Sequence, residues 1–351
     1  MILIAGATGT TGSRIAARLV EQGFPILLGA RNPARLEALA SELGIGESAK
    51  RIIDLSIAEG VVRALKDVTV VVNATSPAAS SALTLARAVT DRGLAYTDIS
   101  GDVATTRTLL ERLGPQARAS KATLSPGAGF APYCGITAVM LGREALPGAR
   151  HVKIWYASPG FKPSRGTLAS EPETLAGPCL SLTAGQILDT SSFGKVERYR
   201  GSYLLTRPML DPLLASVIPG LSDCTATVDM ACAEAYTLGF ISRVARPLLR
   251  QQVIRRSLER RIQSIASTPH PATEPDANNR VTAEVSDGTR SCLITLEAPP
   301  IYEGTATSCA SVAARLYQRP SLFGFVPPPF LFESGAAAVK AGALKLLHTA
   351  H

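Results

Sequence analysis

The chain has 351 residues, of which 46% are hydrophobic and 18% are charged, a balance typical of globular proteins rather than of disordered or fibrous ones. This length predicts about two domains. No apolar run is long enough to cross a bilayer, so we expect no membrane span. The amino-terminal sequence has neither a basic region nor a signal-peptide cleavage site, so we expect a cytoplasmic protein.

The formal net charge of +8 suits an acidic ligand, such as a dinucleotide, or an acidic protein partner. The sequence shows neither basic residues interleaved with aromatic ones nor a helix-turn-helix pattern, and we therefore predict no nucleic-acid binding. Six cysteines are scattered without a C-x-x-C pair, and only four histidines are present. This spacing predicts reduced thiols and no metal site.

The first hundred residues alternate between short apolar runs and helical patterns. Strands are predicted at residues 2–5, 25–29, 51–54, 68–72 and 95–99, and helices at residues 13–22, 33–43, 57–65 and 78–92. Strands that alternate with helices of this length indicate βαβ units. The sequence therefore predicts an α/β fold, with a doubly wound parallel sheet of the Rossmann type.

The pattern changes after about residue 124, where glycine and proline become more frequent. Residues 152–157 alternate like a strand, and residues 280–297 are typical of a hairpin with Asp287-Gly288 at its turn. Late helices are predicted at residues 311–317 and 333–348. We expect three parts: a Rossmann domain at 1–124, an inserted α+β domain with an antiparallel sheet at 125–305, and carboxyl-terminal helices at 306–351.

A glycine-rich turn follows the first strand and leads into the first helix. The spacing GxxGxxG is a variant of the dinucleotide-binding fingerprint, in which glycines permit a tight turn and a close approach of the backbone to a pyrophosphate. The positive end of the helix dipole would face that pyrophosphate. A plain strand-turn-helix is the alternative. The predicted phosphate loop comprises Gly6, Ala7, Thr8, Gly9, Thr10, Thr11 and Gly12.

The end of the second strand favours NADP over NAD. NAD-binding enzymes usually carry an acidic residue there, which binds the ribose 2′-hydroxyl. This chain has Arg31 and Asn32 instead, with Arg35 one helical turn later. A guanidinium suits a 2′-phosphate, although Arg31 as a solvated surface charge is the alternative. Asp54 would contact the adenine amine or cap a helix.

The fourth strand ends in a turn that we expect beside the nicotinamide ribose, because ligands of open α/β sheets lie beyond the carboxyl ends of the strands. Ala74, Thr75 and Ser76 form this turn. An ordinary turn, with Ser76 as a helix cap, is the alternative.

These motifs resemble the saccharopine dehydrogenase-like oxidoreductases, which include saccharopine reductases and trans-acting enoyl reductase-like proteins. The resemblance rests on GATGTTG, GARNPARLEAL, VVNATSPA, YTDISGD and SPGAGFAP, in the family's order within the first 135 or so residues. Weaker similarity covers residues 164–170 and 302–313. One departure is Ser76-Pro77, where the family usually has Gly-Pro.

The resemblance implies a Rossmann domain, an inserted α+β domain and a final segment that packs back on the first domain. It also implies an NADPH-dependent reductase that transfers a hydride to a C=N or C=C bond of a small metabolite. Short-chain dehydrogenases are a competing family, but they need a Tyr-x-x-x-Lys pair. None of the eight tyrosines has a lysine four residues later.

Hydride transfer in some enzymes also needs a proton donor. Asp98 and Asp102, at the end of the fifth strand, and Tyr133 are the candidate catalytic residues. Structural hydrogen bonds, helix capping and packing are the alternative roles for these three. Substrate contacts are expected from Gly101, Gly129, Phe130, Pro132 and Arg165. For Arg165, a surface salt bridge is the alternative role.

The basic stretch at residues 243–261 has the spacing of an amphipathic helix. It is either a solvated face or a docking site for a substrate bound to CoA or to an acidic carrier protein. A small-molecule substrate is expected, and a homodimer is left open. A non-enzymatic NADP-binding regulatory or redox-sensing protein remains the alternative function.

Overall fold

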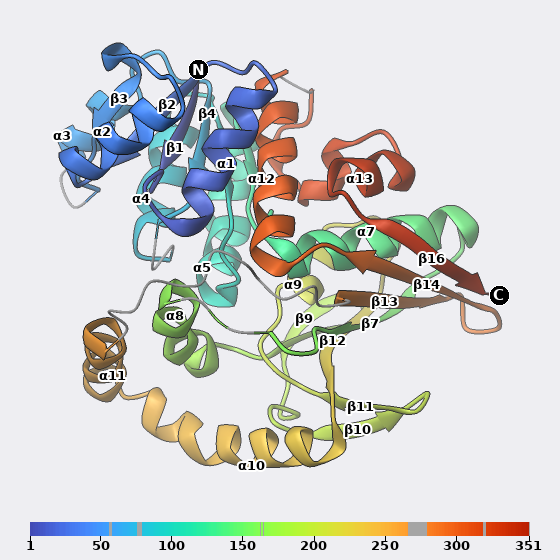
Figure 1. Cartoon of the computed structure of the whole chain (residues 1–351). Coiled ribbons are helices and arrows are strands. Elements are labelled where there is room, and N and C mark those ends of the chain that lie inside the picture. Colours follow the sequence, from blue (N-terminus) through green and yellow to red (C-terminus); the bar gives the residue numbers. More distant parts are fainter. Residues whose placement is uncertain are drawn as a thin grey trace.

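The computed structural model describes residues 1–55, 58–75, 79–161, 163, 165–265, 279–318 and 321–350. These residues form two sheets, of seven and nine strands. The seven-stranded sheet and its helices occupy the upper left of Figure 1, and the nine-stranded sheet occupies the lower right.

The first sheet is parallel throughout and runs in the order β15-β6-β5-β4-β1-β2-β3. This order confirms the predicted doubly wound Rossmann topology. All residues of the inner strands β1, β2, β4 and β5 are buried, as expected of strands covered on both faces. The strands are β1 (Ile2–Ala5), β2 (Ile26–Ala30), β3 (Lys50–Ile52), β4 (Val70–Asn73), β5 (Ala95–Asp98), β6 (Thr123–Ser125) and β15 (Gly324–Phe325).

Helices connect these strands, and a late helix, α12, lies beside α1 (Figure 1). The ring of Phe24 meets that of Tyr317 edge-on at 5.8 Å, where both helices end. An ion pair between Arg18 and Glu303 also joins α1 to α12. The helices are α1 (Thr10–Glu21), α2 (Pro33–Glu42), α3 (Ala58–Ala64), α4 (Ala79–Thr90), α5 (Val103–Thr108), α6 (Gly114–Ala119) and α12 (Ile301–Tyr317), with a 3-10 turn at Glu47–Ala49 and a π-helical turn at Leu109–Leu113.

The second sheet is mixed, in the order β10-β11-β12-β7-β13-β14-β16, with β8 pairing β12 and β9. Its hairpin of β13 and β14 confirms the prediction for residues 280–297. The strands are β7 (His151–Ala157), β8 (Leu180–Thr183), β9 (Gln186–Asp189), β10 (Val196–Tyr199), β11 (Ser202–Leu205), β12 (Asp223–Met230), β13 (Asn279–Ser286), β14 (Ser291–Ala298) and β16 (Lys345–Ala350).

Helices cover this sheet and extend from it. The long helix α7 packs on β13 and β14, and Gly142 allows the close contact, because a Cβ there would lie 2.7 Å from Val285. Among the described residues, no helix is both long and apolar enough to cross a membrane. The helices are α7 (Phe130–Ala145), α8 (Arg165–Ala176), α9 (Asp211–Ala215), α10 (Cys232–Leu249), α11 (Gln252–Ile265) and α13 (Gly335–Ala341), with a 3-10 turn at Pro328–Leu331.

Two expected helices are different in the structure. The prediction of a helix at residues 333–348 is wrong beyond Ala341, because Lys345–Ala350 is strand β16 and pairs with β14. Pairing with a distant strand overrides local helix propensity here. The helix predicted at 243–261 is broken between Leu249 and Gln252, so that α10 and α11 are separate.

Helix α7 lies very close to β7 and α9 at Gly135. A Cβ at this position would lie 2.0 Å from the Tyr156 hydroxyl oxygen and 2.3 Å from Asp211 Oδ1. Both side chains are buried, so neither has open space into which it can move. Only glycine therefore fits between α7 and this pair.

We expect Gly135→Ala to lower the free energy of unfolding by about 2 kcal/mol or more, although alanine is the better helix former, because the methyl group overpacks a buried contact. Chemical denaturation measures the change. Gly148→Ala is the matched control, since a Cβ there would meet only Asp287 Cβ, at 3.8 Å. Equal stability of the two variants would contradict the prediction.

Candidate functional site

The predicted phosphate loop lies at the carboxyl edge of the first sheet, between β1 and α1. Gly6 has a φ of 86°, and a Cβ on it would lie 2.7 Å from the Ala74 carbonyl. A Cβ on Gly12 would lie 2.2 Å from the Gly6 carbonyl oxygen. Both glycines are therefore required for close backbone contacts, as the motif predicts.

The first turn of α1 has N–H groups that remain available for a ligand. Gly9 is the N-cap and makes no side-chain cap, while its own N–H donates to Gly6 O at 3.0 Å. The N–H groups of a helix's first turn have no partner within the helix and lie at its positive end. The geometry of this loop therefore suits a diphosphate.

The arginines that follow β2 lie beside this loop. Arg35 Nη2 donates to the Thr8 carbonyl oxygen at 2.8 Å, which fixes its guanidinium against the loop. Asn32 caps α2 by accepting the Arg35 backbone N–H at 3.0 Å. Arg31 is exposed, and no hydrogen bond or ion pair joins it to any residue that the structure describes. Asp54 is exposed and lies two residues beyond β3.

A buried polar network underlies the turn after β4. Asn73 Oδ1 accepts hydrogen bonds from the hydroxyls of Thr75 at 2.7 Å and Ser81 at 3.1 Å. Its amide donates to the Tyr96 hydroxyl at 3.2 Å, and that hydroxyl donates to Asp98 Oδ2 at 2.7 Å. The network holds the Ala74–Thr75 turn in place above Gly6. Sequence reasoning missed Asn73 and Tyr96, although their positions in β4 and β5 placed them at this edge.

Asp98 joins the first sheet to residues 126–129, the segment between β6 and α7. We call this segment the crossing, because it leads from the first half of the molecule to the second. Its Oδ1 accepts the backbone N–H of Ser100 at 3.1 Å and of Gly127 at 2.9 Å. Its carbonyl oxygen accepts the Ala128 N–H at 2.8 Å. Burial raises the pKa of the Asp98 carboxyl to about 6, although hydrogen bonds from Gly127, Tyr96 and Ser100 oppose the shift.

The other two candidate catalytic residues, Asp102 and Tyr133, form hydrogen bonds in two separate places. Asp102 is the N-cap of α5, where its Oδ1 accepts the Thr105 N–H at 2.6 Å. Tyr133 is fully buried in α7, and its hydroxyl donates to the Ala338 carbonyl oxygen at 2.8 Å. The structure therefore does not bring Tyr133 to the carboxyl edge with the two aspartates. These hydrogen bonds are of the kind that stabilises a fold.

The candidate substrate residues lie around the crossing from β6 to α7. Gly129 packs closely, since a Cβ on it would lie 3.0 Å from Ile99 O. Phe130 and Pro132 are buried in α7. Gly101 is exposed, with open space where a Cβ would stand. Two predicted positions lie outside the description: Ser76, and the side chain of Arg165, at which α8 begins.

The start of α12 meets α8 through a contact that sequence reasoning did not identify. The hydroxyls of Tyr302 and Thr167 lie 2.9 Å apart, and the rings of Tyr302 and Phe161 lie 6.2 Å apart. Figure 1 places α8 below the carboxyl edge of the first sheet. The second half of the molecule therefore lies across the edge that carries the phosphate loop. Tyr302 was present in the resemblance, but nothing in the sequence indicated its partner.

Asp211 is a buried carboxyl near the same crossing, where a Cβ on Gly127 would lie 3.1 Å from the neighbouring Leu210. Asp211 Oδ1 contacts the Tyr156 hydroxyl, which also donates to Ala131 O at 2.7 Å. One hydroxyl proton cannot serve both acceptors fully, so a proton on the carboxyl completes the arrangement. Burial raises the pKa of Asp211 to about 7.

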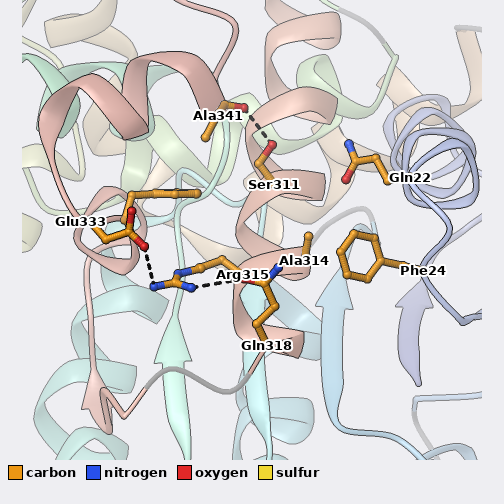
Figure 2. Close-up of a pocket in the computed structure, with 9 residues that line it drawn as sticks. Gln22, Phe24, Ser311, Ala314, Arg315, Gln318, Glu333 and Ala341 are labelled. Atoms are coloured by element: carbon orange, nitrogen blue, oxygen red, sulfur yellow. Dashed lines mark hydrogen bonds and ion pairs between the residues drawn. The ribbon is translucent and has the colours of Figure 1, made fainter.

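A surface pocket of about 510 Å³ lies elsewhere, at the opposite end of α1. Twelve residues of helix separate this end from the phosphate loop, a length of about 18 Å. In Figure 2, Arg315 points toward Glu333 and Gln318, and its guanidinium donates a hydrogen bond to each of them. The pocket is lined by Gln22, Phe24, Ser311, Ala314, Arg315, Gln318, Phe332, Glu333 and Ala341. We do not assign the cofactor to this pocket, because it lies at the wrong edge of the sheet.

Comparison with known proteins identifies a match in the amino-terminal part of the chain. Residues 6–99 match the family of NAD(P)H-binding domains. These residues hold β2 to β5 and the helices between β1 and β5, so the match is confined to the amino-terminal part of the first sheet and its helices. The match begins at Gly6 and spans the glycine loop, the arginines after β2 and the turn after β4. No curated protein sequence matches the chain.

One solved structure has the same fold over the whole chain. The chain is similar to apo saccharopine dehydrogenase (L-Glu forming) from Saccharomyces cerevisiae, with a TM-score of 0.63, 12% identity and coverage of 100% of this chain and 99% of the other. Amine dehydrogenase from Mycobacterium smegmatis has a TM-score of 0.49, with 14% identity and coverage of 93% and 94%. The expected resemblance to saccharopine dehydrogenase is thus confirmed for the fold.

We expect Asp211→Asn to change the pH dependence of stability. The folded-state pKa of about 7 lies above the ordinary value of 3.8. Between these two pH values the folded protein therefore holds a proton that the unfolded chain has released. Stability should therefore fall as pH rises from about 4 to about 7, by at most about 1.4 kcal/mol per pH unit for this group. Asparagine, which does not titrate, should remove that part of the slope.

Denaturation at several pH values measures this effect, with the exposed Asp91→Asn as a control for the loss of one carboxyl. Part of the slope should remain in Asp211→Asn, because the pKa of Asp98 is raised as well. An unchanged slope in Asp211→Asn would show that Asp211 does not hold this proton.

Proposed function

We propose that the protein is an NADP-dependent oxidoreductase that transfers a hydride to a C=N or C=C bond of a small metabolite. The observation that carries the cofactor assignment is the cationic group beside the phosphate loop. Arg35 is fixed on Thr8 at 2.8 Å, and the exposed Arg31 follows β2 directly. No acidic side chain takes the place of Arg31, where NAD-binding enzymes carry one.

The described residues suggest how each part of the cofactor would be held. The first-turn N–H groups of α1 would bind the diphosphate, and the guanidinium groups of Arg31 and Arg35 would bind the 2′-phosphate. The Ala74–Thr75 turn, fixed by Asn73, would lie beside the nicotinamide ribose. Bound NADPH supplies the hydride from its nicotinamide ring.

The substrate is proposed to lie between the carboxyl edge and α8, where Gly101 faces open space. Asp98 would act there as a positioning residue, because both of its carboxylate oxygens already accept hydrogen bonds. The fold of saccharopine dehydrogenase over the full chain supports a C–N substrate, and the resemblance to enoyl reductase-like proteins supports a C=C substrate.

Loss of NADPH absorbance with a panel of imines, enoyl thioesters and carbonyl compounds tests the proposal. Consumption of NADPH with one class supports an oxidoreductase and identifies the bond. Tight NADPH binding without transfer to any acceptor would instead support the alternative, a non-enzymatic NADP-binding regulator.

We expect Arg31→Ala to weaken NADPH binding by about tenfold to a hundredfold, because a charge-assisted hydrogen bond contributes about 1.5–3 kcal/mol. NADH binding should change little, since NADH has no 2′-phosphate. Fluorescence titration with both cofactors measures the ratio.

Arg92→Ala is the matched control, because Arg92 is exposed and follows α4 at the opposite edge of the sheet. An equal loss of affinity for NADPH and NADH in Arg31→Ala would disprove the 2′-phosphate role. A native preference for NADH would overturn the cofactor assignment.

A further inference from the structure

Helices α10 and α11 expose an unusual number of apolar side chains. Phe240 is 64% exposed, Val244 is 57% exposed and Val253 is 80% exposed. Scattered apolar residues are normal on a protein surface, but a contiguous patch usually marks an interaction site. We name this patch the α10–α11 surface; it comprises Tyr236, Phe240, Ile241, Val244, Leu248 and Val253.

The spacing along α10 gathers most of this surface on one face. Tyr236, Phe240, Val244 and Leu248 follow one another at four-residue intervals, so they form one continuous stripe. The residues of α10 that are buried, Ala235, Gly239 and Leu249, lie on the opposite face. The helix therefore packs mainly by Ala235, Gly239 and Leu249 and presents most of its large apolar residues outward.

Helix α10 also lies at the outer edge of the molecule. In Figure 1 it runs along the bottom of the second half, with β10 and β11 above it and none of the drawn helices or strands below it. Helix α11 continues from it and packs against α8. Within the part of the chain that the structure describes, nothing covers the outward stripe.

Positive charge accompanies the apolar stripe. From Cys232 to Ile265 the sequence holds seven arginines and two glutamates. One of these, Arg246, is turned inward, where it donates to Gly177 O at 2.8 Å. The arginines that are exposed are Arg243, Arg250, Arg256, Arg260 and Arg261.

We propose that the α10–α11 surface binds the face of a membrane that contains anionic lipids. Amphipathic helices with aromatic and aliphatic residues on one side and arginines beside them lie in the lipid interface in this way. The apolar side chains would enter the acyl boundary while the guanidinium groups meet the headgroup phosphates. This binding needs no membrane-spanning helix.

Charge argues against a second copy of the chain as the occupant, and shape argues against an acidic protein. A second copy docked by the same surface would place its arginines against these arginines, which opposes an isologous dimer. An acidic protein would satisfy the charge, but the projecting stripe on a single outer helix offers it no groove to fill. A broad anionic lipid surface complements both the charge and the shape.

Co-sedimentation of the full chain with vesicles tests the proposal. We expect binding to phosphatidylcholine vesicles that contain phosphatidylglycerol, with weaker binding to phosphatidylcholine alone and a decrease as salt is added. The double variant Phe240→Ser/Val244→Ser should bind at least about tenfold more weakly, because it removes two exposed apolar anchors. Arg250→Ala/Arg256→Ala should lose roughly tenfold on the anionic vesicles only.

Leu188→Ser/Val62→Ser is the matched apolar control, since these side chains are 45% and 51% exposed on other elements. Arg92→Ala/Arg112→Ala is the matched charge control. Circular dichroism and NADPH titration should show that every variant keeps its fold. Failure to bind anionic vesicles, equal binding to neutral vesicles, or an equal loss in the control variants would overturn the proposal. So would a dimer, seen by light scattering, that Phe240→Ser/Val244→Ser dissociates.

Discussion

One carboxyl group connects the first sheet to the segment that leads into the second half of the molecule. Asp98 ends β5, accepts hydrogen bonds from Tyr96 within its own strand, and reaches Gly127 N–H at the start of the crossing to α7. The following residues are then fixed by α12, because Ser308 Oγ donates to Ala128 O at 2.7 Å and Phe130 N–H donates to Thr305 Oγ1 at 3.1 Å. A buried polar group that is fully bonded specifies one arrangement of its neighbours. The position of the second half over the carboxyl edge depends on this crossing.

The same edge is shaped by backbone contacts that only glycine permits. The Gly6 loop lies directly on the turn after β4, so the two segments that would hold a dinucleotide are also in contact with each other. The network from Asn73 to Asp98 then links that turn to the crossing. The glycine loop, the Ala74–Thr75 turn and the segment between β6 and α7 therefore form one connected framework. A change at any of the three would be expected to affect the others, since they share buried partners.

The sequence predicted the parts of this framework that depend on local pattern. The strands β1 to β5, the glycine loop and the cap at Asn32 follow from short-range signals, and the structure has them within a few residues of their predicted bounds. The parts it could not predict depend on distant partners. Lys345–Ala350 becomes a strand because β14 offers an edge, and β15 joins β6 across about two hundred residues of chain. For the same reason the roles of Asp98 and Tyr133 could not be decided from the sequence, since their partners Gly127 and Ala338 lie far away along the chain.

The arginines of this chain differ in whether their guanidinium groups are bonded within the protein or exposed to solvent. Arg246 and Arg315 are arginines whose guanidinium groups bind carbonyl oxygens of the protein itself. The side chains of Arg31 and Arg250 are exposed, and no hydrogen bond or ion pair joins either to another residue that the structure describes. An exposed cation without a partner costs the fold little stability. It can form a charge-assisted hydrogen bond when an anion binds. Arg31 follows β2 and Arg250 follows α10, so each is available to the anionic ligand proposed for that place.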